Sequence, residues 1–103
     1  MNFQATAMTV EYIRYRIAEE QQTAFIEAIL SANHVLAVAA DCLNFQLAHC
    51  EEDPTLFIWR IEWTSVERHL NGFRKSPEFG AFFQLVKPFY TSIQEMNHYT
   101  VVE

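Results

Sequence analysis

The sequence predicts an α+β fold of the ferredoxin-like kind, with strands and helices in the order βαββαβ. Four segments alternate apolar and polar residues, as half-buried strands do, and two regions between them repeat apolar residues at helical spacing. The third observation is length. Because 103 residues with 50% apolar side chains suffice for one core, we expect a single domain spanning residues 1–103.

The first strand and the first helix meet at Ala18. Alternation over residues 10–17 places three apolar side chains on one face, namely Ile13, Tyr15 and Ile17. Beyond Ala18, apolar residues recur at intervals of three and four, which is the pattern of an amphipathic helix. A strand over 10–17 and a helix over about 19–38 are therefore predicted.

The next two strands are predicted to form an antiparallel hairpin. Residues 43–48 and 55–64 both alternate, and the short turn Glu51-Glu52-Asp53-Pro54 joins them directly. One face of the later strand carries only large apolar side chains: Phe57, Trp59, Ile61 and Trp63. This face is expected to pack against the helices.

The rest of the chain predicts a broken second helix and a last strand. Ser65 is expected to begin a short helix, and Ser76 with Pro77 to cap and start a longer one with an aromatic face. A kink is expected between them, over residues 72–75. Alternation resumes over residues 93–102, which predicts the fourth strand.

This order of elements predicts how the sheet is arranged. Two split βαβ units with right-handed crossovers give an antiparallel sheet of order 4-1-3-2, with both helices on one face. The open face is expected to carry Tyr12, Arg14, Arg16, Asn44, Gln46, Ile58, Arg60 and Glu62. Because large open sheet faces are usually covered, we expect a symmetric homodimer through this face.

The composition excludes two classes of partner. Seven Lys and Arg against thirteen Asp and Glu give a formal net charge of -6, which leaves no basic surface for nucleic acid. No apolar stretch approaches the about 20 residues of a membrane-spanning helix, and the N-terminus lacks the features of a signal peptide. Cys42 and Cys50 are too far apart on one strand for a disulfide. Two reduced thiols are typical of a cytoplasmic protein.

No local motif predicts a metal or a cofactor. The four histidines, His34, His49, His69 and His98, stand at no metal-ligand spacing. With two glycines the chain has no phosphate-binding loop, and it has no nucleophile elbow. We therefore expect neither a metal nor a bound cofactor, and we expect His98 near the dimer seam.

Aromatic side chains are the remaining signal, because nine Phe, four Tyr and two Trp are many for one small core. Those expected between the sheet and the second helix are Tyr15, Trp59, Trp63, Phe79, Phe82 and Phe83. They either fill the core or line a pocket for a flat apolar ligand, to which indole N–H and phenol O–H groups would donate hydrogen bonds. The residues alone leave both alternatives open.

Several stretches stand in a characteristic order along nearly the whole chain. They are Ile13-Arg14-Tyr15-Arg16-Ile17, Cys42-Leu43-Asn44-Phe45-Gln46-Leu47, Asp53-Pro54 followed by Phe57, Ile61-Glu62-Trp63, His69-Leu70, Ser76-Pro77-Glu78-Phe79 with Phe82, and Tyr99-Thr100-Val101-Val102. Their joint spacing resembles the antibiotic biosynthesis monooxygenase (ABM) family of dimeric α+β barrel proteins. The resemblance implies the fold above, a homodimer whose two sheets form a barrel, and a pocket in each subunit between sheet and helices.

The resemblance also implies a function. Some relatives oxidise quinols or anthrone-like polyketides with molecular oxygen and without metal, flavin or haem, by deprotonating the bound substrate. Trp63 matches the tryptophan that these enzymes keep, and the nearest base for such a reaction is His69. The expected ligand is therefore a small aromatic molecule. The residues expected to bind it are Tyr15, Trp59, Arg74, Phe79 and Phe83.

A departure from the family pattern keeps a second hypothesis open. Trp59 stands where polyketide-oxidising members have asparagine, which favours a non-catalytic dimeric module that binds a small apolar ligand. A haem-degrading branch uses an asparagine in the first strand and a histidine in the second helix. The first strand here has no asparagine, and the helix stretch Gly80-Ala81-Phe82-Phe83 has no histidine, so this branch is excluded.

Overall fold

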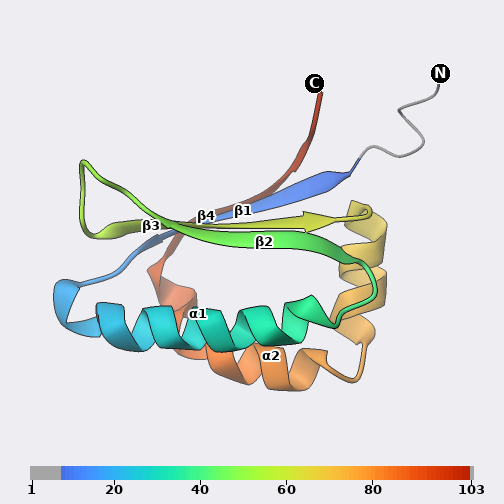
Figure 1. The fold of residues 1–103 in the computed structure, drawn as a ribbon, viewed down its shortest axis with the longest axis horizontal. Helices are drawn as coiled ribbons and strands as arrows, with labels where there is room; N and C mark the ends of the chain where they lie inside the picture. Colours follow the sequence, from blue (N-terminus) through green and yellow to red (C-terminus); the bar gives the residue numbers. More distant parts are fainter. Residues whose placement is uncertain (1–7, 103) are drawn as a thin grey trace.

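A computed structural model describes residues 8–102 as a four-stranded antiparallel sheet with two helices on one face (Figure 1). The main elements follow the order βαββαβ. They are β1 (Thr9–Arg16), α1 (Gln22–Ala37), β2 (Cys42–His49), β3 (Leu56–Trp63), α2 (Phe79–Val86) and β4 (Ile93–Thr100). The strand order β2-β3-β1-β4 is the predicted order read from the opposite edge. The predicted ferredoxin-like α+β fold is confirmed.

Short helical segments lead into the helices or connect them. A 3₁₀ turn, η2 (Glu19–Gln21), precedes α1, and another, η5 (Lys87–Ser92), continues α2 toward β4. Between β3 and α2 the chain forms a π-helical turn, η3 (Arg68–Gly72), followed by a 3₁₀ turn, η4 (Phe73–Lys75). The predicted break over residues 72–75 therefore corresponds to η4, and the short helix predicted before it is mainly the wider π-helical turn η3.

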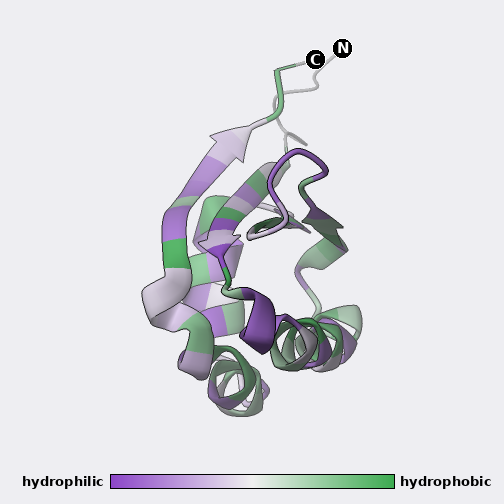
Figure 2. Ribbon diagram, turned by 90° about the vertical axis from the view of Figure 1, so that its left-hand side faces the viewer, coloured by the Kyte–Doolittle hydropathy of each residue, from purple (hydrophilic) through white to green (hydrophobic). Residues whose placement is uncertain are grey.

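The core lies between the sheet and the helices. The inward side chains of β3 are the predicted ones, Phe57, Trp59, Ile61 and Trp63, and none is more than 1% exposed. From α1, Phe25 and Ile29 pack against them with no exposed surface. Burying each such side chain contributes about 1.5–3 kcal/mol. Seen from the end, the two helices lie side by side along one side of the sheet (Figure 2).

The two predicted serine caps have different outcomes. Ser65 Oγ accepts a hydrogen bond from the Arg68 N–H at 3.0 Å, so it begins the short helix as predicted. Ser76 as an N-cap is wrong, because α2 begins only at Phe79. The Ser76 hydroxyl instead donates to the Phe73 carbonyl oxygen at 2.7 Å. This hydrogen bond gives a partner to a carbonyl oxygen of η4. The chain then turns once more before α2 begins at Phe79.

Two smaller predictions concern the thiols and the membrane. Cys42 and Cys50 are free and half-buried at the two ends of β2. Burial raises the pKa of the Cys42 thiol to about 11, which leaves it unreactive at neutral pH. Within residues 8–102, no helix combines the length and the apolar character needed to cross a membrane.

The sheet face opposite the helices carries mixed side chains, as predicted. Tyr12 meets Tyr99 edge to face, with ring centroids 5.4 Å apart. The charged side chains on this face are largely paired with one another, as in the contact between Arg60 and Glu62. Ile58, in the middle of β3, is half-buried on this face. A surface of rings and neutralised charge is suited to contact with another protein surface.

We propose that a second copy of the chain covers this face. Sedimentation velocity at micromolar concentration should show a dimer, and Ile58→Lys should convert it to a monomer by placing an unpaired charge in the interface. Leu30→Lys, on the exposed side of α1, should leave the dimer intact. A wild-type monomer under these conditions would contradict the proposal.

Candidate functional site

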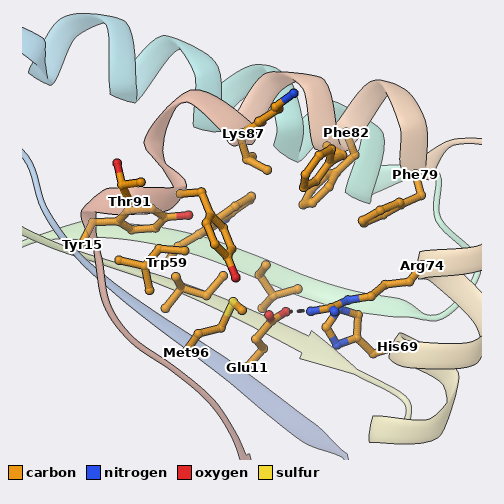
Figure 3. Close-up of a pocket in the computed structure, with 16 residues that line it drawn as sticks. Glu11, Tyr15, Trp59, His69, Arg74, Phe79, Phe82, Lys87, Thr91 and Met96 are labelled. Atoms are coloured by element: carbon orange, nitrogen blue, oxygen red, sulfur yellow. Dashed lines mark ion pairs between the residues drawn. The ribbon is translucent and has the colours of Figure 1, made fainter.

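A cavity of about 510 Å³ lies between the sheet and α2. Its sheet side includes Ile13, Tyr15 and Trp59, and α2 covers it with Phe79, Phe82 and Phe83. Glu11, His69 and Arg74 gather at one end, whereas Tyr15 and Thr91 lie toward the other (Figure 3). This volume falls within the range of small-molecule sites, about 300–1,000 Å³. The aromatic residues therefore form both a core and a pocket wall.

The structure brings most of the predicted site residues to this cavity. Those that line it are His69, Tyr15, Trp59, Arg74, Phe79 and Phe83. Trp63 lies behind them. Its ring stacks on the His69 imidazole with centroids 4.3 Å apart, and its Nε1–H donates to Glu11 Oε1 at 3.0 Å. Trp63 therefore does not line the cavity itself but contacts two residues that do, His69 and Glu11.

Neither indole N–H donates into the cavity, contrary to the sequence-based expectation. Trp63 uses its N–H on Glu11, and the Trp59 N–H donates to Asn33 Oδ1 at 2.9 Å inside the core. A buried indole N–H needs an acceptor, and α1 supplies one from its inward face. Trp59 thus offers the cavity only an aromatic surface.

Glu11, a buried carboxylate at the cavity, was not among the predicted site residues. Its side chain points inward from β1 and the residue is only 3% exposed. Burial raises the pKa of the Glu11 carboxyl group to about 6, although the Trp63 hydrogen bond and the charge of Arg74 act in the opposite direction. A signal for it existed, because Glu11 has the same phase as Ile13 and Tyr15 in the alternation of β1.

His69 is held between two partners by the π-helical turn η3. Its Nε2 lies 3.6 Å from Glu11 Oε1, and its Nδ1 lies 2.8 Å from Nε2 of His98. Burial lowers the pKa of the His69 imidazole to about 3, helped by the charges of Arg74 and His98. The imidazole is therefore neutral at physiological pH. Single π turns occur frequently at functional sites.

His98 lies on the cavity side of the sheet and not on the open face where a dimer seam was expected. It is the register partner of Glu11 across the β1–β4 pair, so both side chains share one face. It is half-buried, and its pKa is lowered by burial and by the charge of Arg74. Sequence spacing could not predict its contact with His69, because the two residues are 29 positions apart and only the folded structure brings η3 next to β4.

Arg74 supplies the positive charge of the site. Its side chain extends from η4 toward His69 and Glu11 (Figure 3). Within residues 8–102 it forms no ion pair, whereas Arg14, Arg16 and Arg68 each pair with an acidic side chain. An unpaired guanidinium at the end of an apolar cavity can stabilise a ligand's negative charge.

Glu11, His69 and His98 are also residue types that bind metals, and one ligand atom of each lies within 4.8 Å of the others. Two observations disfavour a metal here. The His69 ring directs its two nitrogens at different partners, and one ring binds a given ion through a single nitrogen. Arg74 would also repel a divalent cation. The geometry fits a chain of three polar side chains in contact better than a metal site.

The fold and the cavity define a small α+β protein with an aromatic-walled pocket between its sheet and its second helix. The sequence profile of the family described as antibiotic biosynthesis monooxygenase matches residues 8–85. This match covers most of the chain, and the protein belongs to that family. It is also 26% identical over 92 residues to the uncharacterized protein YczJ of Bacillus subtilis, covering 89% of this chain and 97% of YczJ.

Solved structures show the same fold. A candidate antibiotic biosynthesis monooxygenase from Bordetella bronchiseptica has a TM-score of 0.80 at 21% identity, covering 94% of this chain and 99% of that one. SnoaB, a cofactor-independent oxygenase from Streptomyces nogalater, has a TM-score of 0.76 at 10% identity, covering 93% and 94%. At these identities the likeness establishes the fold alone.

The Trp59–Asn33 hydrogen bond predicts the effect of a substitution in α1. Asn33→Ala should lower the free energy of unfolding by about 1–3 kcal/mol, because it leaves a buried indole N–H without an acceptor. Urea denaturation measures this. His34→Ala, on the exposed side of the same helix, is the matched control and should change stability by less than about 0.5 kcal/mol. Equal effects of the two substitutions would contradict the assigned hydrogen bond.

The buried imidazole predicts a pH dependence of stability. His69 has a pKa of about 3 in the folded protein against 6.5 ordinarily, so the unfolded chain binds its proton first as the pH falls. Its contribution to stability is present above pH 6.5 and is lost toward pH 3. Glu11, with its raised pKa, acts in the opposite direction between about pH 6 and 4.5.

The wild type should therefore lose more free energy of unfolding between pH 6.5 and 4.5 than His69→Gln does. Urea denaturation at both pH values gives the comparison, and His34→Gln should behave like the wild type. Parallel losses in the wild type and His69→Gln would show that His69 titrates normally in the folded protein.

Proposed function

We propose that the protein is a cofactor-independent monooxygenase that acts on a small aromatic hydroxylated compound of the quinol or anthrone kind. One observation carries the proposal: an aromatic-walled cavity ends on a buried carboxylate–imidazole pair beside an unpaired guanidinium. Membership of the ABM family supports it, as does the fold shared with the oxygenase SnoaB.

The chemistry needs a substrate that becomes electron-rich in place. Tyr15, Trp59, Phe79 and Phe83 would hold its rings flat, with the hydroxyl group at the Glu11–His69 end. Removal of the hydroxyl proton leaves a phenolate or enolate that can itself react with molecular oxygen. For an anthrone, one oxygen atom becomes the new carbonyl oxygen and the other leaves as water with the two hydrogens of the oxidised carbon.

Arg74 and Trp63 would support this step without taking the proton. Arg74 would stabilise the anion, whose charge develops in surroundings of low polarity. Trp63 would position the acceptors, because it donates a hydrogen bond to Glu11 and stacks on His69. We assign His69 to the catalytic group with Glu11 beside it, and Trp63 to a positioning role.

A non-catalytic dimeric module that binds a small apolar ligand is the second candidate. It is favoured by Trp59, whose N–H is used by Asn33, so that the cavity gains no polar group at that position. Both candidates place a small molecule in the same cavity of each subunit of a dimer, an aromatic hydroxylated compound in the first case and an apolar ligand in the second. A cytoplasmic location stays a prediction for either of them.

Oxygen consumption distinguishes the two candidates. With a panel of quinols and anthrones, the wild type should consume oxygen above the uncatalysed rate for at least one compound. His69→Ala should lower kcat/KM by about 100-fold, because it disrupts the proton-accepting pair. Trp63→Phe should lower it by about tenfold, because it removes the hydrogen bond that holds Glu11.

His34→Ala provides the control and should leave the rate unchanged. Binding is followed separately, by quenching of tryptophan fluorescence with an anthraquinone, since Trp59 lines the cavity. Quenching without oxygen consumption for any compound would reject the oxygenase and support the binding module. If the protein shows no quenching and consumes no oxygen with any compound, both candidates are rejected.

A further inference from the structure

Three side chains from β1, η3 and β4 form a chain that leads out of the cavity. Glu11 lines the cavity, His69 follows at 3.6 Å, and His98 follows His69 at 2.8 Å on the edge strand β4. We propose that this chain is a proton path, in which Glu11 takes the substrate proton and His69 and His98 pass it to solvent. The inference rests on the proposed function, because it assigns roles within the same site.

Glu11 is the entry to the path. Its Oε1 accepts the Trp63 hydrogen bond and faces His69, whereas its Oε2 has no hydrogen bond to any residue in the range 8–102. Glu11 is also one of the residues that line the cavity, so its carboxylate can meet a molecule bound there. A substrate hydroxyl can therefore donate to Oε2 while Oε1 stays anchored.

His69 is the middle of the path. A neutral imidazole accepts a proton at one nitrogen and donates one from the other. When Nε2 takes the proton from the Glu11 carboxyl group, the Nδ1 proton passes to Nε2 of His98. His69 ends as its other neutral tautomer, and Glu11 is again a carboxylate. No proton remains in the buried part of the site.

His98 is the exit. It now carries a proton on each ring nitrogen and, because it is half-buried on an edge strand, it can release the proton on Nδ1 to water. Its lowered pKa favours release over storage of that proton. Along this path the proton moves only between polar side chains and does not cross the apolar walls of the cavity.

The charges around the chain fit this direction of transfer. The titratable or charged groups that act on its members are Arg74 from η4, Tyr15 from β1 and Cys42 from β2. Tyr15 and Cys42 both have raised pKa values and stay neutral, so Arg74 is the remaining charge. It disfavours a positive charge on either histidine, so a proton is not stored on the chain.

Two substitutions separate the entry from the exit. Glu11→Gln keeps an acceptor for Trp63 but cannot take a proton, and it should lower kcat by about 100-fold or more. His98→Ala should lower kcat by about tenfold in weak buffer and leave KM unchanged. Added imidazole should restore the rate of His98→Ala and should not restore that of Glu11→Gln.

Imidazole rescue distinguishes a proton path from a structural role, since a packing defect does not depend on buffer. His34→Ala should show neither loss nor rescue. If the wild type consumes oxygen and Glu11→Gln retains its rate, or His98→Ala is not rescued, the path is overturned and the proposed function stands. If the wild type consumes no oxygen with any quinol or anthrone, both fail.

Two measurements test the chain without turnover. The NMR resonance of the Trp63 indole N–H should shift between pH 4.5 and 7.5 as Glu11 ionises, and the shift should vanish in Glu11→Gln. Calorimetric titration with zinc should show no stoichiometric binding. Binding of one zinc ion per chain that is lost in His98→Ala would overturn the path, because all three side chains would then be metal ligands.

Discussion

The inward carboxylate of Glu11 is the constraint on which the rest of the site depends. Removing a carboxylate from water costs several kcal/mol unless nearby groups compensate it. Here the compensation comes from the Trp63 N–H on β3 and the Arg74 charge on η4, and the His69 ring on η3 lies against the same carboxylate. A regular helix after β3 would not bring two consecutive turns to the same carboxylate. The π turn followed by the 3₁₀ turn does, which accounts for the irregular connection at this place.

The same constraint helps to explain why neither indole N–H group is offered to a ligand in the cavity. The two tryptophans that could have donated hydrogen bonds along its length use their N–H groups on Glu11 and Asn33. Phe82 stacks against Trp59 with centroids 5.7 Å apart, so this part of the wall consists of packed rings. These rings select for a flat ligand, and a ligand hydroxyl group at the Glu11–His69 end can fix its orientation.

Alternation and helical spacing predicted every main element, because β3 and α1 bury one continuous apolar face each. They also predicted that Tyr15, Trp59, Phe79 and Phe83 lie between the sheet and the second helix, where all four are found. The sequence did not predict Glu11 and His98 as cavity-side residues. Alternation identifies inward positions by their apolar side chains, and these two inward positions hold polar residues. Their pairing depends on the β1–β4 register, and the contact with His69 depends on the pitch of η3. Neither can be read from local sequence.

The need for an exit path follows from the burial of the acceptor. Glu11 is almost fully buried before any ligand enters, and a flat substrate in the cavity would cover its remaining access. A proton left on Glu11 would return to the phenolate, whose reaction with oxygen depends on staying deprotonated. Among residues 8–102 the route away from Glu11 that avoids the substrate passes through His69, 3.6 Å from Glu11, and then through the hydrogen bond from His69 to His98. The half-buried position of His98 on an edge strand thus gives a deeply buried base a way to lose its proton to solvent, and the two imidazole rings reorient before the next proton enters.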